Sequence, residues 1–256
     1  MSGFCQICPN HGGPDNCKYD PRDDEDESSL IVGHHEIAPR QVVSTILKPG
    51  QMVHIRRGWA YSYRVMPNGE RQLGGIYSDG DILCWPNVFS SRSGCSSRAI
   101  TKLDICVINI DSFTKRVRGD GRFFQFFQRL LERQFLALTD RTFDLCHRSA
   151  EQRLCRILIK ACLSLCGKIG NYMEPIPITQ EILADLIGAT KIHVNRLLSS
   201  LRQRNVCHVS HGYLSILDWE RLIETAEVTL AELDEWKDLL APQIYPPPIQ
   251  KKELDA

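Results

Sequence analysis

The stretch of residues 177–214 constrains the fold most strongly, because it reads as two short amphipathic helices joined by a turn that contains Gly188. Thr179 can cap the first helix, and a tight turn with glycine lets the second helix cross the first. Apolar residues repeat at helical spacing in both segments, at Ile182, Leu183, Leu186 and Ile187 and then at Val194, Leu197, Leu198 and Leu201. Residues 206–216 alternate roughly and turn at a His-Gly pair, as a β-hairpin wing does. The pattern favours a winged helix-turn-helix over a plain helical hairpin.

The second of these helices has a polar face that predicts a nucleic-acid partner. With its apolar face buried, it presents Lys191, His193, Asn195, Arg196 and Ser199, which are groups that hydrogen-bond base edges and phosphates. The formal net charge is zero, but residues 148–216 carry nine basic and four acidic side chains, whereas residues 1–29 carry two and seven. The basic part of the chain therefore coincides with the helix-turn-helix, as phosphate binding requires.

Length and composition exclude several classes of protein. The 256 residues suffice for two domains of ordinary size. The chain has no run of 18 apolar residues and no basic-then-apolar N-terminal signal, so we expect a cytoplasmic protein with no membrane partner. It has no phosphate-cradling glycine loop of the usual kinds, no His-Glu-x-x-His and no nucleophile elbow, so we do not expect an enzyme.

Residues 1–29 form a cysteine-containing segment and an acidic linker. The chain has eleven cysteines, which without an export signal favour metal binding, redox chemistry or buried thiols over a disulfide scaffold. Cys5 and Cys8 have the Cys-x2-Cys spacing of metal ligands, and Cys17 follows in a segment that has no hydrophobic period. These cysteines predict a loop organised by a metal; the alternative is a disordered tail with incidental thiols.

Residues 30–118 predict a β-roll or jelly-roll-like sandwich, because short strands alternate there with glycine turns. We expect strands at Val42–Leu47, Met52–Arg56, Trp59–Val65, Arg71–Tyr77, Ala99–Lys102 and Ile105–Ile110. His34 and His35 precede these strands in a polar stretch and are expected at the surface.

Residues 119–147 predict a long dimerisation helix, since its apolar positions follow the steps of 3 and 4 of a coiled-coil seam. The expected interface residues are Phe127, Leu131, Gln134, Leu138, Arg141 and Leu145. The alternative is an ordinary amphipathic helix within one subunit. Residues 148–225 would form the DNA-binding domain, in which Ser149 and Gln152 can make a capping box, and residues 226–256 a C-terminal helix and tail.

The sequence resembles the CRP/FNR superfamily of transcription regulators from about residue 30 to 225. The most specific matches are A-E-Q-R-L at 150–154, I-T-Q-E-I-L-A-D-L-I-G at 178–188 and V-N-R-L-L at 194–198. The resemblance implies an α+β fold: an N-terminal β-roll, a long dimer helix and a C-terminal winged helix. It also implies a homodimer that binds palindromic DNA and contacts RNA polymerase.

Within this superfamily the sequence looks most similar to the oxygen-sensing FNR branch. That resemblance implies a [4Fe–4S] cluster held by Cys5, Cys8, Cys17 and, from the β-roll, Cys106, and loss of the cluster in oxygen would weaken the dimer and its DNA binding. The sequence departs from the branch in the gap between Cys8 and Cys17, which is longer than in the best-known motif.

Other inputs to the same fold remain open from the residues. Cys5, Cys8, His11 and Cys17 suit a structural Cys3His zinc site, or the thiols could form a redox switch. Cys106 alone could be a buried apolar thiol. A small-molecule effector in the β-roll is a further alternative. For a cyclic nucleotide, Asp81 and Arg92-Ser93 imitate part of the required site, but the usual glutamate is absent.

The resemblance carries over to the DNA-contacting residues only in part. Arg196 matches the arginine that contacts a guanine, whereas Ile192 stands where both branches use a glutamate that reads a base. An isoleucine cannot accept a hydrogen bond from cytosine, but it can touch a thymine methyl. The full candidate set for DNA contact is Thr179, Gln180, Lys191, Ile192, His193, Asn195 and Arg196.

Overall fold

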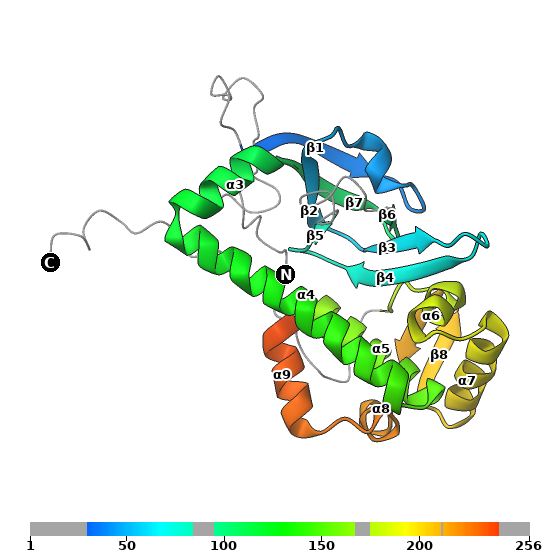
Figure 1. The fold of residues 1–256 in the computed structure, drawn as a ribbon. Helices are drawn as coiled ribbons and strands as arrows, with labels where there is room; N and C mark the ends of the chain where they lie inside the picture. Colours follow the sequence, from blue (N-terminus) through cyan, green and yellow to red (C-terminus); the bar gives the residue numbers. More distant parts are fainter. Residues whose placement is uncertain (1–29, 84–94, 167–174, 211, 241–256) are drawn as a thin grey trace, which may run out of the picture.

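The computed structural model describes residues 30–83, 95–166, 175–210 and 212–240. A sheet-rich N-terminal part lies above a long diagonal helix, and a smaller helical part with a two-stranded sheet lies below it (Figure 1). The predicted α+β class is therefore confirmed. No helix in the described part of the chain is long and apolar enough to cross a membrane.

Two antiparallel sheets form the N-terminal roll. One has the strand order β1-β7-β2-β5 and the other β4-β3-β6. The strands are β1 (Ile31–Ile37), β2 (Gln51–Arg57), β3 (Ala60–Val65), β4 (Arg71–Tyr77), β5 (Ile82–Leu83), β6 (Cys95–Ala99) and β7 (Leu103–Asn109). Successive side chains of a strand point to opposite faces, so alternate residues meet between the sheets. Val53, Ile55, Ala60, Ala99 and Ile105 lie in this buried core.

The strand predictions were right for β2, β3, β4 and most of β7, but the predicted strand Ala99–Lys102 is wrong beyond Ala99, where β6 ends. Arg71–Tyr77 is β4, and the predicted strand Met52–Arg56 lies within β2. The predicted strand Val42–Leu47 is wrong: residues Val43–Ile46 form a 3-10 turn, η2, which inserts the fully buried Val43 into the core. The strand β1 was missed, because its polar His34-His35 pair interrupts the apolar pattern.

The long helix is broken near its start. Helix α3 (Ile110–Gly119) ends at Asp120, whose side chain accepts a hydrogen bond from the Phe123 amide at 3.2 Å and so caps the following helix, α4 (Gly121–His147). Both helices pack on the outer face of the four-stranded sheet, where Met52 and Ile108 are buried. The aromatic rings of Phe113 and Phe123 meet there edge to face, with centroids 5.2 Å apart.

The C-terminal part is a winged helix-turn-helix. It consists of α5 (Ala150–Cys166), α6 (Gln180–Ile187), α7 (Lys191–Gln203), the wing strands β8 (Cys207–Ser210) and β9 (Tyr213–Ile216), and α8 (Trp219–Ala226). The expected capping box precedes α5: the Ser149 amide donates to Gln152 Oε1 at 2.8 Å and the Gln152 amide to Ser149 Oγ at 3.2 Å. A further helix, α9 (Leu230–Leu240), packs on α5.

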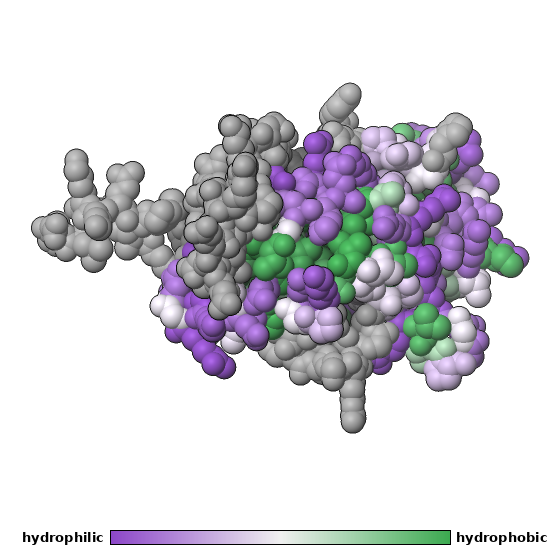
Figure 2. Space-filling view, turned by 90° about the horizontal axis from the view of Figure 1, so that it is seen from above, coloured by the Kyte–Doolittle hydropathy of each residue, from purple (hydrophilic) through white to green (hydrophobic). Residues whose placement is uncertain are grey.

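One continuous apolar core joins the roll to the helix-turn-helix. Trp59, Tyr61 and Leu73 of the roll are buried in the same cluster as Leu186 and Leu198 of the C-terminal part. The two parts are thus packed together rather than linked by a free hinge. Figure 2 shows the molecule from above: apolar residues gather near the centre of this face beside hydrophilic ones, and a few further apolar residues lie at its right-hand edge.

Candidate DNA-binding surface and sensor site

The turn between α6 and α7 has the geometry that the sequence predicts. Gly188 has a φ of 65° and ends α6 in the left-handed conformation that glycine adopts at no steric cost. Thr179 Oγ1 accepts from the Ile182 amide at 3.3 Å and Thr190 Oγ1 from the His193 amide at 3.2 Å, so each helix has a threonine cap. These local hydrogen bonds fix where α7 begins.

Helix α7 buries one face and exposes the other. Val194, Leu198 and Leu201 are buried, whereas Lys191, Ile192, His193, Asn195 and Arg196 are all exposed. Thr179 is exposed and Gln180 half-buried at the start of α6. The candidate DNA-contacting residues therefore lie together at the N-terminal ends of the two helices.

This exposed surface has the chemistry of a DNA reader. Helix α7 contains no acidic residue, so its lysine and arginine charges are available to phosphates. Gln180 Nε2 lies 3.4 Å from Asn195 Oδ1 and links the two helices. Ile192 is 69% exposed in the first turn of α7, so its side chain is accessible to a partner. The surface can thus offer phosphate contacts, polar base contacts and one apolar contact.

Cys106 lies in β7 on the outer face of the roll. It is opposite His34 of β1 and His54 of β2, so the three side chains share one face of the sheet. Its Sγ atom lies 3.7 Å from His34 Nδ1, and the thiol is 1% exposed. Met52 and Ile108, two residues further along β2 and β7, contact the helices α3 and α4 on this same face. The thiol is therefore next to the packing contact of the long helix.

His54 is a buried polar side chain next to this thiol. Burial, with a smaller contribution from the charge of Arg56, lowers the pKa of His54 to about 4, so the ring is neutral at pH 7. Neither ring nitrogen has a hydrogen-bond partner among the described residues. Sequence reasoning missed His54 and expected His34 at the surface, because residues 20 to 72 positions apart in sequence meet here only through strand register.

The other predicted metal ligands, Cys5, Cys8, Cys17 and the alternative ligand His11, lie outside the described residues, as do Arg92 and Ser93. Within the described ranges no group of three or more histidine, cysteine or acidic side chains has the arrangement of a metal site. Asp81, the expected nucleotide contact, instead forms a buried ion pair with Arg133 of α4 and accepts from the Ser78 amide at 2.7 Å. Its carboxylate is thus engaged within the protein.

The expected dimer residues are distributed over two sides of α4. Leu131, Leu138 and Leu145 are exposed. Phe127 instead contacts the Phe113 ring of its own chain, and Arg141 donates to carbonyl groups of its own β4; Gln134 is half-buried. Further large apolar side chains are exposed on α4, namely Phe124, Phe135 and Phe143. The exposed residues still repeat at coiled-coil steps.

A polar contact joins the roll to α6. Arg71 of β4 donates to Asp185 Oδ2 at 2.6 and 3.0 Å and to Glu181 Oε1 at 3.1 Å. Its guanidinium also donates to the Tyr61 hydroxyl at 3.0 Å. The pKa of Arg71 is raised by these partners despite its partial burial. This contact carried no sequence signal, since Arg71 and Asp185 are 114 residues apart.

Comparison with known proteins identifies a known domain in the C-terminal part and similar regulators. Residues 152–225 match the Crp-like helix-turn-helix domain. The nitrogen fixation regulation protein FixK of Bradyrhizobium diazoefficiens is 26% identical over 163 residues, which cover 62% of this chain and 67% of that protein. The chain therefore contains a Crp-like helix-turn-helix domain and is similar to transcription regulators of the CRP/FNR family. Its relatives are regulators rather than enzymes, as the absence of enzymatic motifs predicted.

Further similarities to transcription regulators extend over most of the chain. The fumarate and nitrate reduction regulatory protein of Yersinia pestis is 21% identical over 173 residues, covering 67% of this chain and 69% of that protein. The structure of FixK2 from Bradyrhizobium japonicum superposes with a TM-score of 0.65 at 18% identity, over 78% of this chain and all of that one. A CRP-family regulator from Thermus thermophilus gives 0.65 at 14% identity, over 77% and 99%. These structures support the fold.

Proposed function

We propose that this CRP/FNR-type regulator is a cytoplasmic homodimer that binds a palindromic DNA site through α7, contacts RNA polymerase, and responds to oxygen or redox state through an iron–sulfur cluster. The exposed, acid-free face of α7 is the observation that carries DNA binding. The exposed apolar residues of α4 support the dimer, because a second copy would bury them. A dimer also suits DNA binding, because two recognition helices related by a two-fold axis can reach successive major grooves.

Arg196 provides the direct test of the DNA surface. An arginine–guanine contact contributes about 1–3 kcal/mol of discrimination, so Arg196→Ala should weaken specific binding in a fluorescence anisotropy titration by roughly tenfold or more. The binding site is first selected from random duplexes with the wild-type protein. Arg64→Ala removes an equal charge from an exposed position on β3 and should leave the affinity unchanged. Equal effects of the two substitutions would contradict the assignment of α7 as the reader.

Cys106 suits one ligand position of a cluster. Iron–sulfur clusters are held by cysteine thiolates, and the thiol of Cys106 lies on the outer face of the roll, flanked by two imidazoles. The remaining ligands would be Cys5, Cys8 and Cys17. When bound, a cluster would supply iron chemistry that oxygen can alter. Because Met52 and Ile108 on the same sheet face contact α3 and α4, a change at Cys106 would reach the dimer helix directly.

The cluster is tested on protein purified without oxygen. We expect visible absorption that bleaches in air, with iron and sulfide near four per chain, as for a [4Fe–4S] centre. Cys106→Ala should lose iron and sulfide while the roll stays folded by circular dichroism. Cys155→Ala removes another fully buried thiol, whose pKa burial raises to about 12, and should keep both. Full iron and sulfide in Cys106→Ala would reject the ligand assignment; zinc in place of iron would instead support the structural site at the N-terminus.

A further inference from the structure

A network of polar contacts on the outer face of the roll ends at the thiol of Cys106. Its Sγ atom lies 3.7 Å from His34 Nδ1 and 3.9 Å from His34 Nε2. The same Nδ1 atom lies 3.5 Å from Arg56 Nη1, and Arg56 Nη1 lies 3.2 Å from a carboxylate oxygen of Asp104. These four side chains come from the neighbouring strands β1, β7 and β2, so strand register assembles the network.

The contact with Arg56 indicates which nitrogen of His34 carries the hydrogen. A guanidinium group is always charged and can only donate hydrogen bonds, so the Nδ1 atom that faces it must accept. In a neutral imidazole one nitrogen accepts and the other carries the hydrogen. The hydrogen of the His34 ring is therefore assigned to Nε2, from its hydrogen-bond partners. This N–H group is the donor that the ring can offer to Cys106 Sγ.

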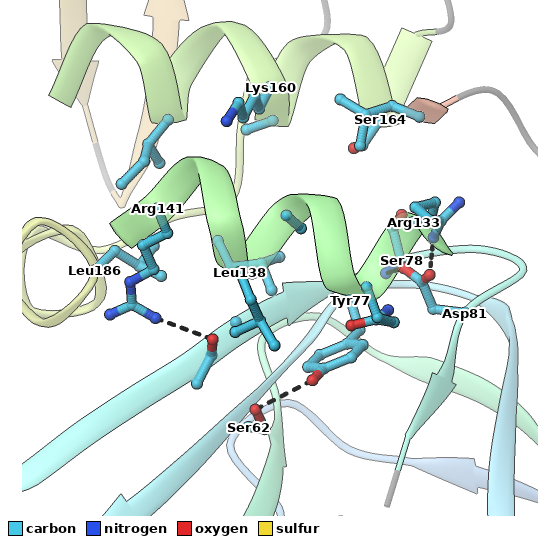
Figure 3. Close-up of a pocket in the computed structure, with 18 of the residues that line it drawn as sticks. Ser62, Tyr77, Ser78, Asp81, Arg133, Leu138, Arg141, Lys160, Ser164 and Leu186 are labelled. Atoms are coloured by element: carbon cyan, nitrogen blue, oxygen red, sulfur yellow. Dashed lines mark hydrogen bonds and ion pairs between the residues drawn. The ribbon is translucent and has the colours of Figure 1, made fainter. Parts of the chain in front are cut away.

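The orientation of the His34 ring depends in turn on a fixed arginine. A buried guanidinium requires a carboxylate partner. The Arg56 side chain is only 9% exposed and has Asp104 as its partner, just as Arg133 of α4 has Asp81 (Figure 3). Because Asp104 positions Arg56, and Arg56 contacts Nδ1 of His34, the ring is aligned before any ligand binds at the thiol.

A donor to the Cys106 sulfur would change the properties of a cluster bound there. Cysteine holds iron as the thiolate, and hydrogen bonds to the sulfurs help to set the reduction potential of the cluster. A donor withdraws electron density from the thiolate, which stabilises the reduced and more negatively charged state. Groups that orient a metal ligand in this way contribute about 10–100-fold to metal affinity.

We propose that His34 is a positioning residue for Cys106, which donates its Nε2–H to the thiolate and thereby strengthens iron retention and raises the reduction potential of the cluster. This inference rests on the proposed iron–sulfur cluster and extends it to a residue that is not itself a ligand. The neighbouring His35 is exposed and has no such role.

Three variants of the full-length protein, purified without oxygen, test this role. His34→Ala should release iron to a chelator roughly tenfold faster than the wild type, and its reduction potential should be more negative. His34→Gln keeps an acceptor for Arg56 in its amide oxygen and a donor in its amide nitrogen, so it should resemble the wild type. His35→Ala is the matched control and should change neither quantity.

The outcomes separate this role from the cluster itself. An intact cluster with wild-type iron release and potential in His34→Ala would overturn the role of His34 alone. Equal losses in His34→Ala and His34→Gln would show that packing, not a hydrogen bond, is required, and would also overturn it. If His34→Ala takes up no iron, uptake by His34→Gln supports the role. A wild type without iron and sulfide would overturn both the cluster and this role.

The tautomer of His34 provides a measurement that needs no cluster. Long-range ¹H–¹⁵N NMR of the full-length protein without iron, at alkaline pH where imidazoles are neutral, distinguishes the two ring nitrogens. We expect the hydrogen of His34 on Nε2. A hydrogen on Nδ1 would face the guanidinium of Arg56 and leave Nε2 with nothing to donate, which would overturn the proposal.

Discussion

The contact between Arg71 and Asp185 should contribute measurably to the coupling of the roll and the helix-turn-helix. The two side chains are each 21% exposed and 2.6 Å apart, so solvent screens them only partly. A hydrogen bond to a charged group contributes about 1.5–3 kcal/mol, and the more exposed Glu181 adds about 0–1 kcal/mol. Arg71→Ala should therefore lower the free energy of unfolding by about 2–3 kcal/mol.

A double-mutant cycle isolates this pair. Urea unfolding of the wild type, Arg71→Ala, Asp185→Ala and the double variant should give a coupling energy of about 1–2 kcal/mol, because part of each single effect belongs to other partners. Arg64→Ala, an exposed arginine on the adjacent strand β3, should change the free energy of unfolding by no more than about 0.5 kcal/mol. A coupling energy below about 0.5 kcal/mol would refute the view that this ion pair joins the two parts.

Three further predictions follow from single side chains. If Ile192 contacts a thymine methyl group, replacing that thymine with deoxyuridine in the selected site should weaken DNA binding by the wild type several-fold and leave the affinity of Ile192→Ala unchanged. An equal loss of affinity in both proteins would contradict this role of Ile192. Phe135, 68% exposed on α4, should be a dimer contact, so Phe135→Glu should sediment as a monomer, and a persistent dimer would place the interface elsewhere. The pKa of Glu232 is lowered, against an opposing effect of burial, by hydrogen bonds from Thr229 and Arg156. The stabilising contribution of Glu232 should therefore be complete above the ordinary pKa of a carboxyl group and decline as the pH falls through the lower pKa of the folded state. In thermal unfolding measured over a series of pH values, Glu232→Gln should lose less stability at acid pH than the wild type does. The same loss in both proteins would contradict this contribution.

The helix-turn-helix was predictable because its signals are local. Thr179 and Thr190 each cap a helix through an amide three residues away. Gly188 permits the left-handed turn, and the spacing of Val194 and Leu198 places one face of α7 in the core. Each of these interactions spans a few positions, so the sequence pattern contains it.

The predictions for the long helix and the strands were partly right for a related reason. Periodicity identifies an amphipathic helix, but it does not say which of two adjacent apolar stripes faces the same chain. Phe127 was expected at a dimer interface, and the structure places it against Phe113 of its own chain. Residues Val42–Leu47 were expected to form a strand, but a 3-10 turn at Val43–Ile46 buries Val43 in the core equally well.

The sequence by itself determined the winged helix-turn-helix, the roll-like character of residues 30–118 and the polar residues that α7 exposes. Tertiary structure alone decided which distant groups meet. Strand register brings His34, Cys106 and His54 to one face, and packing of the roll on α6 brings Arg71 to Asp185 across 114 residues. Local propensity acts over one or two turns of chain, whereas these contacts form only when separate apolar surfaces become buried against each other.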